Sequence, residues 1–208
     1  RVNYNGKGQD APFKVMARYG NDAQEKEVSS VETTDMPYKL SYEIDATAAD
    51  NDNAKLTDDG KPLNAGVYKV SLEKDADSTT VDNYTWGDSL QKMTFTVVAF
   101  NLSDTTQTIE VNIEESPYTG SDQNSATNNI IKDAITIQVK LDPTDENLTT
   151  LATTDYTVTS PDSSTEVKEV GTYPLTLTGT GNYRGTLTSQ PPASQIDPYT
   201  VSKVDLAN

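Results

Sequence analysis

The sequence predicts an all-β protein made of two tandem domains, each a sandwich of antiparallel sheets. Three observations support this prediction. The 208 residues suit two sandwich domains of about 100 residues each. Short segments alternate between apolar and polar residues, with Gly, Pro, Asn, Asp and Ser between them. Finally, the second half of the chain repeats motifs of the first.

Strict alternation is clearest in residues 38–44, 68–72 and 135–141. A period of two places one side of a strand on a core and the other side in water, as in antiparallel sheets with one solvated face. No segment shows the period of an amphipathic helix, so we expect none of useful length. Shorter alternating segments predict further strands at residues 13–17, 95–99, 109–113, 156–158 and 173–177.

Internal repetition sets the domain organisation. Four short motifs of the first half recur in the same order in the second half, with loops of different length between them. We therefore predict two copies of one unit, at residues 1–104 and 105–208. The paired motifs are residues 4–9 and 118–123, 65–68 and 170–173, 83–84 and 182–183, and 95–102 and 199–206.

Composition excludes several classes of function. With 16 basic and 32 acidic residues the net charge is −16, which disfavours nucleic acids and anionic membranes as partners. The chain has no His and no Cys, so Ser–His–Asp and Cys–His centres and the usual zinc sites cannot form. A carboxylate pair stays open, but 32 acidic residues make such a pair unspecific. We expect no enzyme activity.

One loop is a candidate calcium site. Asp50, Asp52, Asp58 and Asp59 lie close together in the sequence, and calcium prefers six to eight oxygen ligands of this kind. Their spacing differs from that of an EF-hand. The alternative is an acidic loop that is simply solvated.

Two aromatic residues form a candidate carbohydrate site. Tyr84 and Trp86 follow each other closely, and an exposed aromatic pair could stack on a sugar ring. Alternatively, Trp86 closes the end of a small core. An exposed platform would favour a carbohydrate-binding module of an extracellular glycan-active protein.

Several motifs of the second half carry a family resemblance. Tyr118-Thr119-Gly120, Asp155-Tyr156, Gly171-Thr172-Tyr173 and Asn182-Tyr183 occur in the order seen in bacterial Ig-like repeats, including those called MBG. The first half resembles these repeats more loosely. We expect positive φ angles at Gly120 and Gly171, as at turn positions.

The resemblance implies tandem Ig-like β-sandwich domains of a Gram-positive (Firmicutes) cell-surface protein. A β-grasp-like repeat is the structural alternative. It further implies an extracellular, cell-wall-associated or secreted multidomain protein, in which such repeats are spacers or adhesive modules without catalytic residues. Expected partners are neighbouring repeats of the same protein and host or cell-wall glycans or proteins. Consistent with this, the chain begins at Arg1 and contains no apolar run that could cross a bilayer, so we expect a monomeric segment of a longer exported protein.

Overall fold

The computed structural model describes residues 1–18, 24–28, 35–49, 51–85, 93–124, 130–160, 165–191 and 194–205. The predicted fold class is confirmed, because the protein is nearly all β and folds into several sheets. Its described helices are a single 3₁₀ turn, η1 (Val81–Asn83), and one four-residue α-helix, α1 (Ile130–Asp133). No described helix is long and apolar enough to span a membrane. The chain divides into two compact units, residues 1–98 and 99–208.

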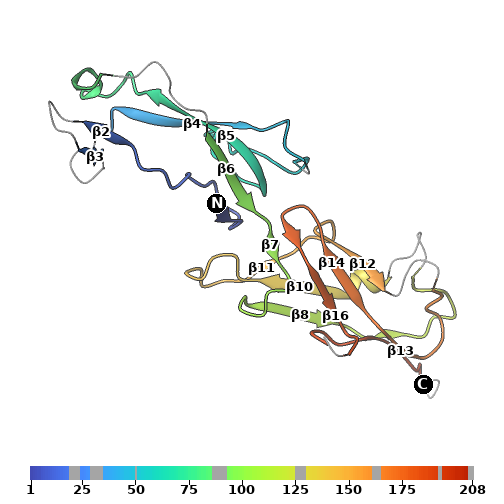
Figure 1. Ribbon diagram of the computed structural model, residues 1–208. Coiled ribbons are helices and arrows are strands. Elements are labelled where there is room, and N and C mark those ends of the chain that lie inside the picture. Colours follow the sequence, from blue (N-terminus) through green and yellow to red (C-terminus); the bar gives the residue numbers. More distant parts are fainter. Residues whose placement is uncertain are drawn as a thin grey trace. The chain divides into compact units, whose positions relative to one another are not determined.

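The first unit is built on a four-stranded sheet in the order β1-β6-β5-β4 (Figure 1). Tyr42, Tyr68 and Phe95 point from its three long strands into one core, as their alternation predicts. A separate hairpin pairs β2 with β3. The bounds are β1 Val2–Asn3, β2 Met16–Arg18, β3 Glu25–Glu27, β4 Tyr38–Ile44, β5 Gly66–Lys74 and β6 Met93–Val98.

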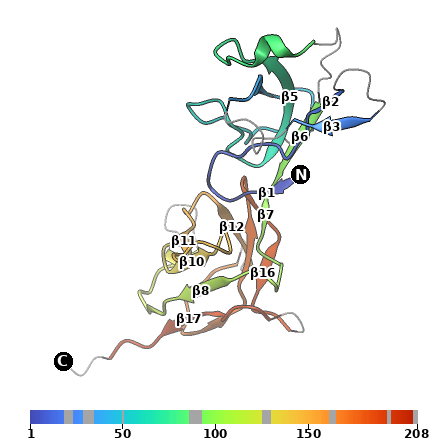
Figure 2. The ribbon, with the colours of Figure 1, turned by 90° about the vertical axis from the view of Figure 1, so that its left-hand side faces the viewer.

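The second unit contains three sheets of three strands, in the orders β11-β10-β8, β12-β14-β16 and β13-β17-β9, and the pair β15-β7. Figure 2 shows β8, β10 and β11 together in this unit. Its core includes Ile137, Leu177 and Tyr199, which are completely buried. The bounds are β7 Phe100–Asn101, β8 Ile109–Ile113, β9 Ser116–Pro117, β10 Ile135–Val139, β11 Thr149–Thr150, β12 Tyr156–Ser160, β13 Gly171–Tyr173, β14 Thr176–Gly179, β15 Tyr183–Arg184, β16 Thr186–Thr188 and β17 Tyr199–Ser202.

Two predicted strands differ from the structure. The strand predicted at residues 13–17 forms only at its end, as β2 (Met16–Arg18). Residues 173–177 alternate, yet they belong to two strands in different sheets, since β13 ends at Tyr173 and β14 begins at Thr176. Pro174 lies between them, and a proline cannot donate a ladder hydrogen bond. Leu175 is completely buried at this crossover, so the alternation reflects burial on both sides of a break.

The division between the units lies at Val98 and Ala99, six residues before the predicted boundary at residue 104. Residues 100–103 belong to the second unit and are hydrogen-bonded to it. The Phe100 N–H donates to the Asn182 carbonyl (2.9 Å), and the Leu102 N–H donates to the Arg184 carbonyl (2.8 Å). Repeat motifs could not reveal this pairing, because the hydrogen bonds are made by backbone groups.

The sequence predicts antiparallel sheets, but three pairs of strands are parallel. β1 pairs with β6, β7 with β15, and β9 with β17, all in parallel. Each of these pairs includes a two-residue strand that joins another strand after a long excursion of the chain. A long connection is what parallel pairing needs, whereas a tight hairpin cannot provide it.

The two units share one three-strand arrangement. In the first, Gly66 lies opposite Val97 and the Tyr4 N–H donates to the Val98 carbonyl (2.8 Å). In the second, Gly171 lies opposite Val201 and the Tyr118 N–H donates to the Ser202 carbonyl (2.9 Å). The paired sequence motifs therefore occupy equivalent places.

The two glycines behave differently. Gly120 has the expected positive φ of 74°, and so does its counterpart Gly6 at 75°. Gly171 is the first residue of β13 and is not among the glycines with positive φ, so the expectation for it was wrong.

Candidate functional site

The described carboxylates of the acidic loop in the first unit do not lie together. Asp52, Asp58 and Asp59 are exposed, and Asp50 lies outside the described residues. Asp59 accepts a hydrogen bond from the Thr57 hydroxyl (2.5 Å), which lowers the pKa of its carboxyl group. Within the described ranges, no three acidic side chains come together as metal ligands would. The calcium site stays a prediction.

An amide side chain organises this loop. Asn51 Nδ2 donates to the carbonyls of Asp45 and Val67 (both 2.9 Å), and its Oδ1 accepts from the Val67 N–H (2.7 Å). The Tyr68 hydroxyl donates to the Asn64 carbonyl (2.6 Å) and accepts from the Lys55 N–H (3.1 Å). These bonds satisfy buried polar groups and help to order this long polar loop.

The candidate carbohydrate pair is described only in part. Tyr84 follows η1 and is half-buried. Trp86 lies outside the described residues. Whether the two rings share a surface therefore stays a prediction.

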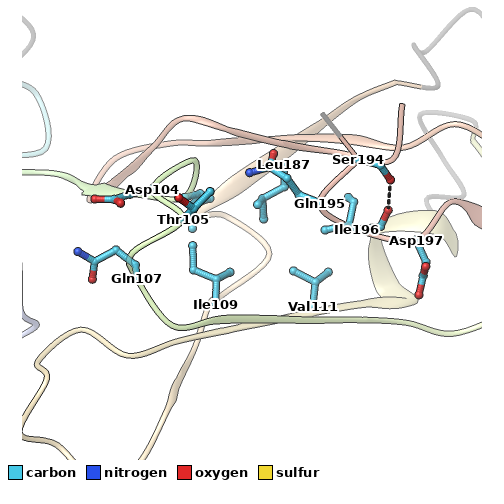
Figure 3. Close-up of a pocket in the computed structure, with 11 residues that line it drawn as sticks. Asp104, Thr105, Gln107, Ile109, Val111, Leu187, Ser194, Gln195, Ile196 and Asp197 are labelled. Carbon is cyan, nitrogen blue, oxygen red and sulfur yellow. Dashed lines mark hydrogen bonds between the residues drawn. The ribbon is translucent and has the colours of Figure 1, made fainter. Parts of the chain in front are cut away.

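The second unit contains a groove between β8 and the residues around β16. It has a volume of about 460 Å³, in the range of ligand sites. Figure 3 shows Ile109 and Val111 of β8 on one side, pointing toward Leu187 of β16 and toward Ile196 on the other. Leu187 and Ile196 are buried, while Ile109 and Val111 are half-buried, and these four form an apolar floor. Polar residues line the rest of the partly open groove: Thr105, Gln107, Ser194 and Gln195.

Two carboxylates lie at the ends of this groove. Asp104 and Asp197 stand at opposite ends of it, with the apolar floor between them (Figure 3). Asp104 Oδ1 accepts hydrogen bonds from the Thr106 hydroxyl (2.7 Å) and the Thr106 N–H (3.0 Å). These bonds lower the pKa of Asp104, so the carboxylate is ionised at neutral pH. No Lys or Arg lines the groove, and its potential is therefore negative.

The groove could not be predicted from the sequence. Alternation identified Ile109 and Val111 as one face of a strand, and that strand is confirmed. The opposite wall comes from residues about 80 positions later, and nothing in a single sequence pairs them. The turn that holds Asp104 is visible in the sequence only as a run of small polar residues.

Comparison with known proteins gives one match. A family model of the MBG domain matches residues 104–205. No curated protein and no solved structure matches the chain. The match covers nearly all of the second unit, the half in which the motif resemblance is stronger. The second unit is therefore similar to the MBG domain.

Proposed function

We propose that this chain is a non-catalytic, load-bearing spacer of a bacterial cell-surface or secreted multidomain protein. The similarity of residues 104–205 to the MBG domain supports a surface module, as does the acidic chain without His or Cys. The tandem arrangement of two units with the same strand frame supports a repeated structural element. In this proposal the neighbouring repeats are the main partners, and the location is extracellular.

One observation carries the load-bearing role. In the first unit, β1 near the unit's beginning hydrogen-bonds in parallel to β6 at its end. Tension along the chain pulls these two strands past one another, so their hydrogen bonds must break together. An antiparallel pair pulled from one end opens one bond at a time, and a smaller force suffices. Forced unfolding is governed by this kinetic barrier.

A pulling experiment with two geometries tests the proposal. The chain has no native Cys, so introduced thiols give unique attachment points for optical tweezers. Arg1→Cys with Ala99→Cys loads β1 against β6 in shear. Ala65→Cys with Ala99→Cys loads one end of the antiparallel pair in which Gly66 faces Val97. The first unit serves in both measurements, which makes the second geometry a matched control.

We expect the shear geometry to unfold at clearly higher force than the peeling geometry at the same loading rate. Equal forces, or a lower force in shear, would overturn the load-bearing role. Circular dichroism of both double variants checks that the sheet is intact before pulling.

A further inference from the structure

On one edge of β8, backbone N–H and C=O groups have no hydrogen-bond partner among the described residues. β8 pairs with β10 so that the Lys140 N–H donates to the Thr108 carbonyl and the Glu114 N–H donates to the Ala134 carbonyl (both 3.0 Å). In an antiparallel ladder the hydrogen-bonded positions alternate. The N–H and C=O groups of Ile109 and Val111 therefore point away from β10. No other residue in the described part of the chain hydrogen-bonds them.

Across the groove, by contrast, three of the outward-facing backbone groups of β16 already have hydrogen-bond partners. β16 is also the last strand of its sheet, with Thr186 and Thr188 facing outward. The Thr186 N–H donates to Ser103 Oγ (2.7 Å), and Ser103 Oγ donates to the Thr186 carbonyl (2.9 Å). The Thr188 carbonyl accepts from the Gln195 N–H (2.7 Å). A strand that enters the groove therefore finds its hydrogen-bonding partners on β8.

We propose that the groove beside β8 binds an extended peptide segment of another protein, which adds a strand to the sheet β11-β10-β8. An exposed sheet edge gives affinity through main-chain hydrogen bonds, and pockets beside it select alternate side chains. Here the floor formed by Ile109, Val111, Leu187 and Ile196 selects apolar side chains. Asp104 and Asp197 lie at the two ends of the groove, so they select a Lys or Arg on each side of the peptide's apolar residues. This binding role is additional to the spacer role and does not depend on it.

The chemistry of the lining favours a peptide over a sugar. A sugar site uses aromatic rings as a platform, and the residues that line this groove include none. Anionic partners are opposed by both carboxylates and by the net charge of −16. A cationic peptide with alternating apolar and polar residues matches the two carboxylates in charge, the apolar floor and polar sides in polarity, and the free backbone groups of β8 in hydrogen bonding.

The test measures fluorescence anisotropy of a fluorescein-labelled heptapeptide, KTVTVTK, in which both Lys share one face of the strand with the two Val, titrated with the full chain. Two matched peptides accompany it. ETVTVTE reverses the terminal charges, and KTPTVTK removes one main-chain donor that would face β8. We expect KTVTVTK to bind saturably, and both other peptides to bind about tenfold more weakly or worse. Binding should also weaken as salt rises, because the two carboxylates are solvent-accessible.

Protein variants locate the binding. Val111→Pro removes an outward-facing N–H, and proline is tolerated on edge strands because the ladder to β10 is untouched. We expect it to weaken binding of KTVTVTK about tenfold. Asp104→Asn with Asp197→Asn should weaken it to a similar extent while retaining the side-chain oxygen that the Thr106 turn uses. The second variant keeps the test valid if the proline variant fails to fold.

The control is Asp142→Asn with Asp155→Asn. It removes two charges from the same unit, and Asp142 holds a turn with Thr144 of the same kind as Asp104 with Thr106. We expect this variant to bind the peptide as the parent does. Three results would overturn the proposal: no binding at about 1 mM peptide, equal binding by the parent and both groove variants, or sedimentation showing that the groove is filled by a second copy of the chain.

Discussion

Tyr199→Phe removes a single buried oxygen atom from the centre of the second unit. Tyr199 and Gln123 are both completely buried, and the Tyr199 hydroxyl donates to Gln123 Oε1 (2.5 Å). Gln123 Nε2 donates in turn to the Pro117 carbonyl (3.0 Å). This chain of bonds links β17 to the residues around β9. Burial raises the pKa of Tyr199, and a hydrogen bond with the Ser116 side chain partly opposes that rise. The hydroxyl is therefore neutral and a donor across the ordinary pH range.

The expected loss of unfolding free energy comes from the polar group that the substitution leaves without a partner. Phenylalanine fills nearly the same volume, so the loss comes mainly from the Gln123 carbonyl oxygen, which stays buried without its donor. An unsatisfied buried polar group costs about 1–3 kcal/mol. For a unit of this size, that corresponds to a fall in Tm of roughly 4–15 °C. We expect only the transition of the second unit to move.

Differential scanning calorimetry of the full chain measures this effect, with urea unfolding as a second readout. Tyr173→Phe is the matched control, because its hydroxyl donates to the Glu169 carbonyl (2.8 Å) at an exposed position where water can replace it. We expect that control to change the unfolding free energy by less than about 0.5 kcal/mol. If Tyr199→Phe costs no more than Tyr173→Phe, the buried hydrogen bond does not stabilise the unit and the reasoning fails.

Three further predictions concern other positions. Phe95→Tyr should stabilise the first unit by about 0.5–1.5 kcal/mol and raise its Tm in calorimetry. Phe95 is the counterpart of Tyr199, and the new hydroxyl can accept a hydrogen bond from Gln9 Nε2, which is buried without a partner; an unchanged or lower Tm would contradict this. Gly185→Ala should cost about 1–3 kcal/mol in urea unfolding, since Gly185 has a φ of +82° and an added Cβ would come within 2.5 Å of Ser103 Oγ; an unchanged midpoint would contradict this. The hydroxyl and N–H of Thr47 and the ammonium of Lys69 lower the pKa of Asp45, so its folded pKa lies below the unfolded value and its contribution is lost as the pH falls below about 4. Urea unfolding of Asp45→Asn between neutral pH and pH 2 should therefore show a shallower acid loss than the parent, and parallel curves would refute the assignment.

Much of the fold could be predicted because its signals are local. Residues 38–44 and 109–113 alternate over the same spans as β4 and β8, since each strand has one face on a core. Prediction failed where a nonlocal effect decided the structure. Pro174 divides an alternating segment between two sheets, and residues 99–103 join the second unit through backbone hydrogen bonds.

The candidate sites show the same limit. Clusters of Asp are visible in a sequence, but side-chain convergence is not, and the described Asp52, Asp58 and Asp59 do not form a metal-binding group. The groove, in contrast, forms in the structure although no cluster of residues in the sequence indicates it. Its walls come from β8 and from residues near β16, and its open backbone edge depends on the register with β10. Neither property has a signature in residue types.

The equivalence of the two units at backbone level explains which differences between them matter. The Gln9 N–H donates to the Pro62 carbonyl, and the Gln123 N–H donates to the Val167 carbonyl (both 2.9 Å), so both glutamines occupy one place in the frame. Only the second copy has a tyrosine that donates to the glutamine's Oε1, because Phe95 stands where Tyr199 stands. The atom without a partner in the first unit is Gln9 Nε2, whereas Gln123 Nε2 donates to the Pro117 carbonyl, so the backbone pairing is kept while the side-chain bonds of the glutamine differ. The first unit carries the cost of this unpaired atom in its core, and the reciprocal substitutions at residues 95 and 199 should therefore move the two units' stabilities in opposite directions.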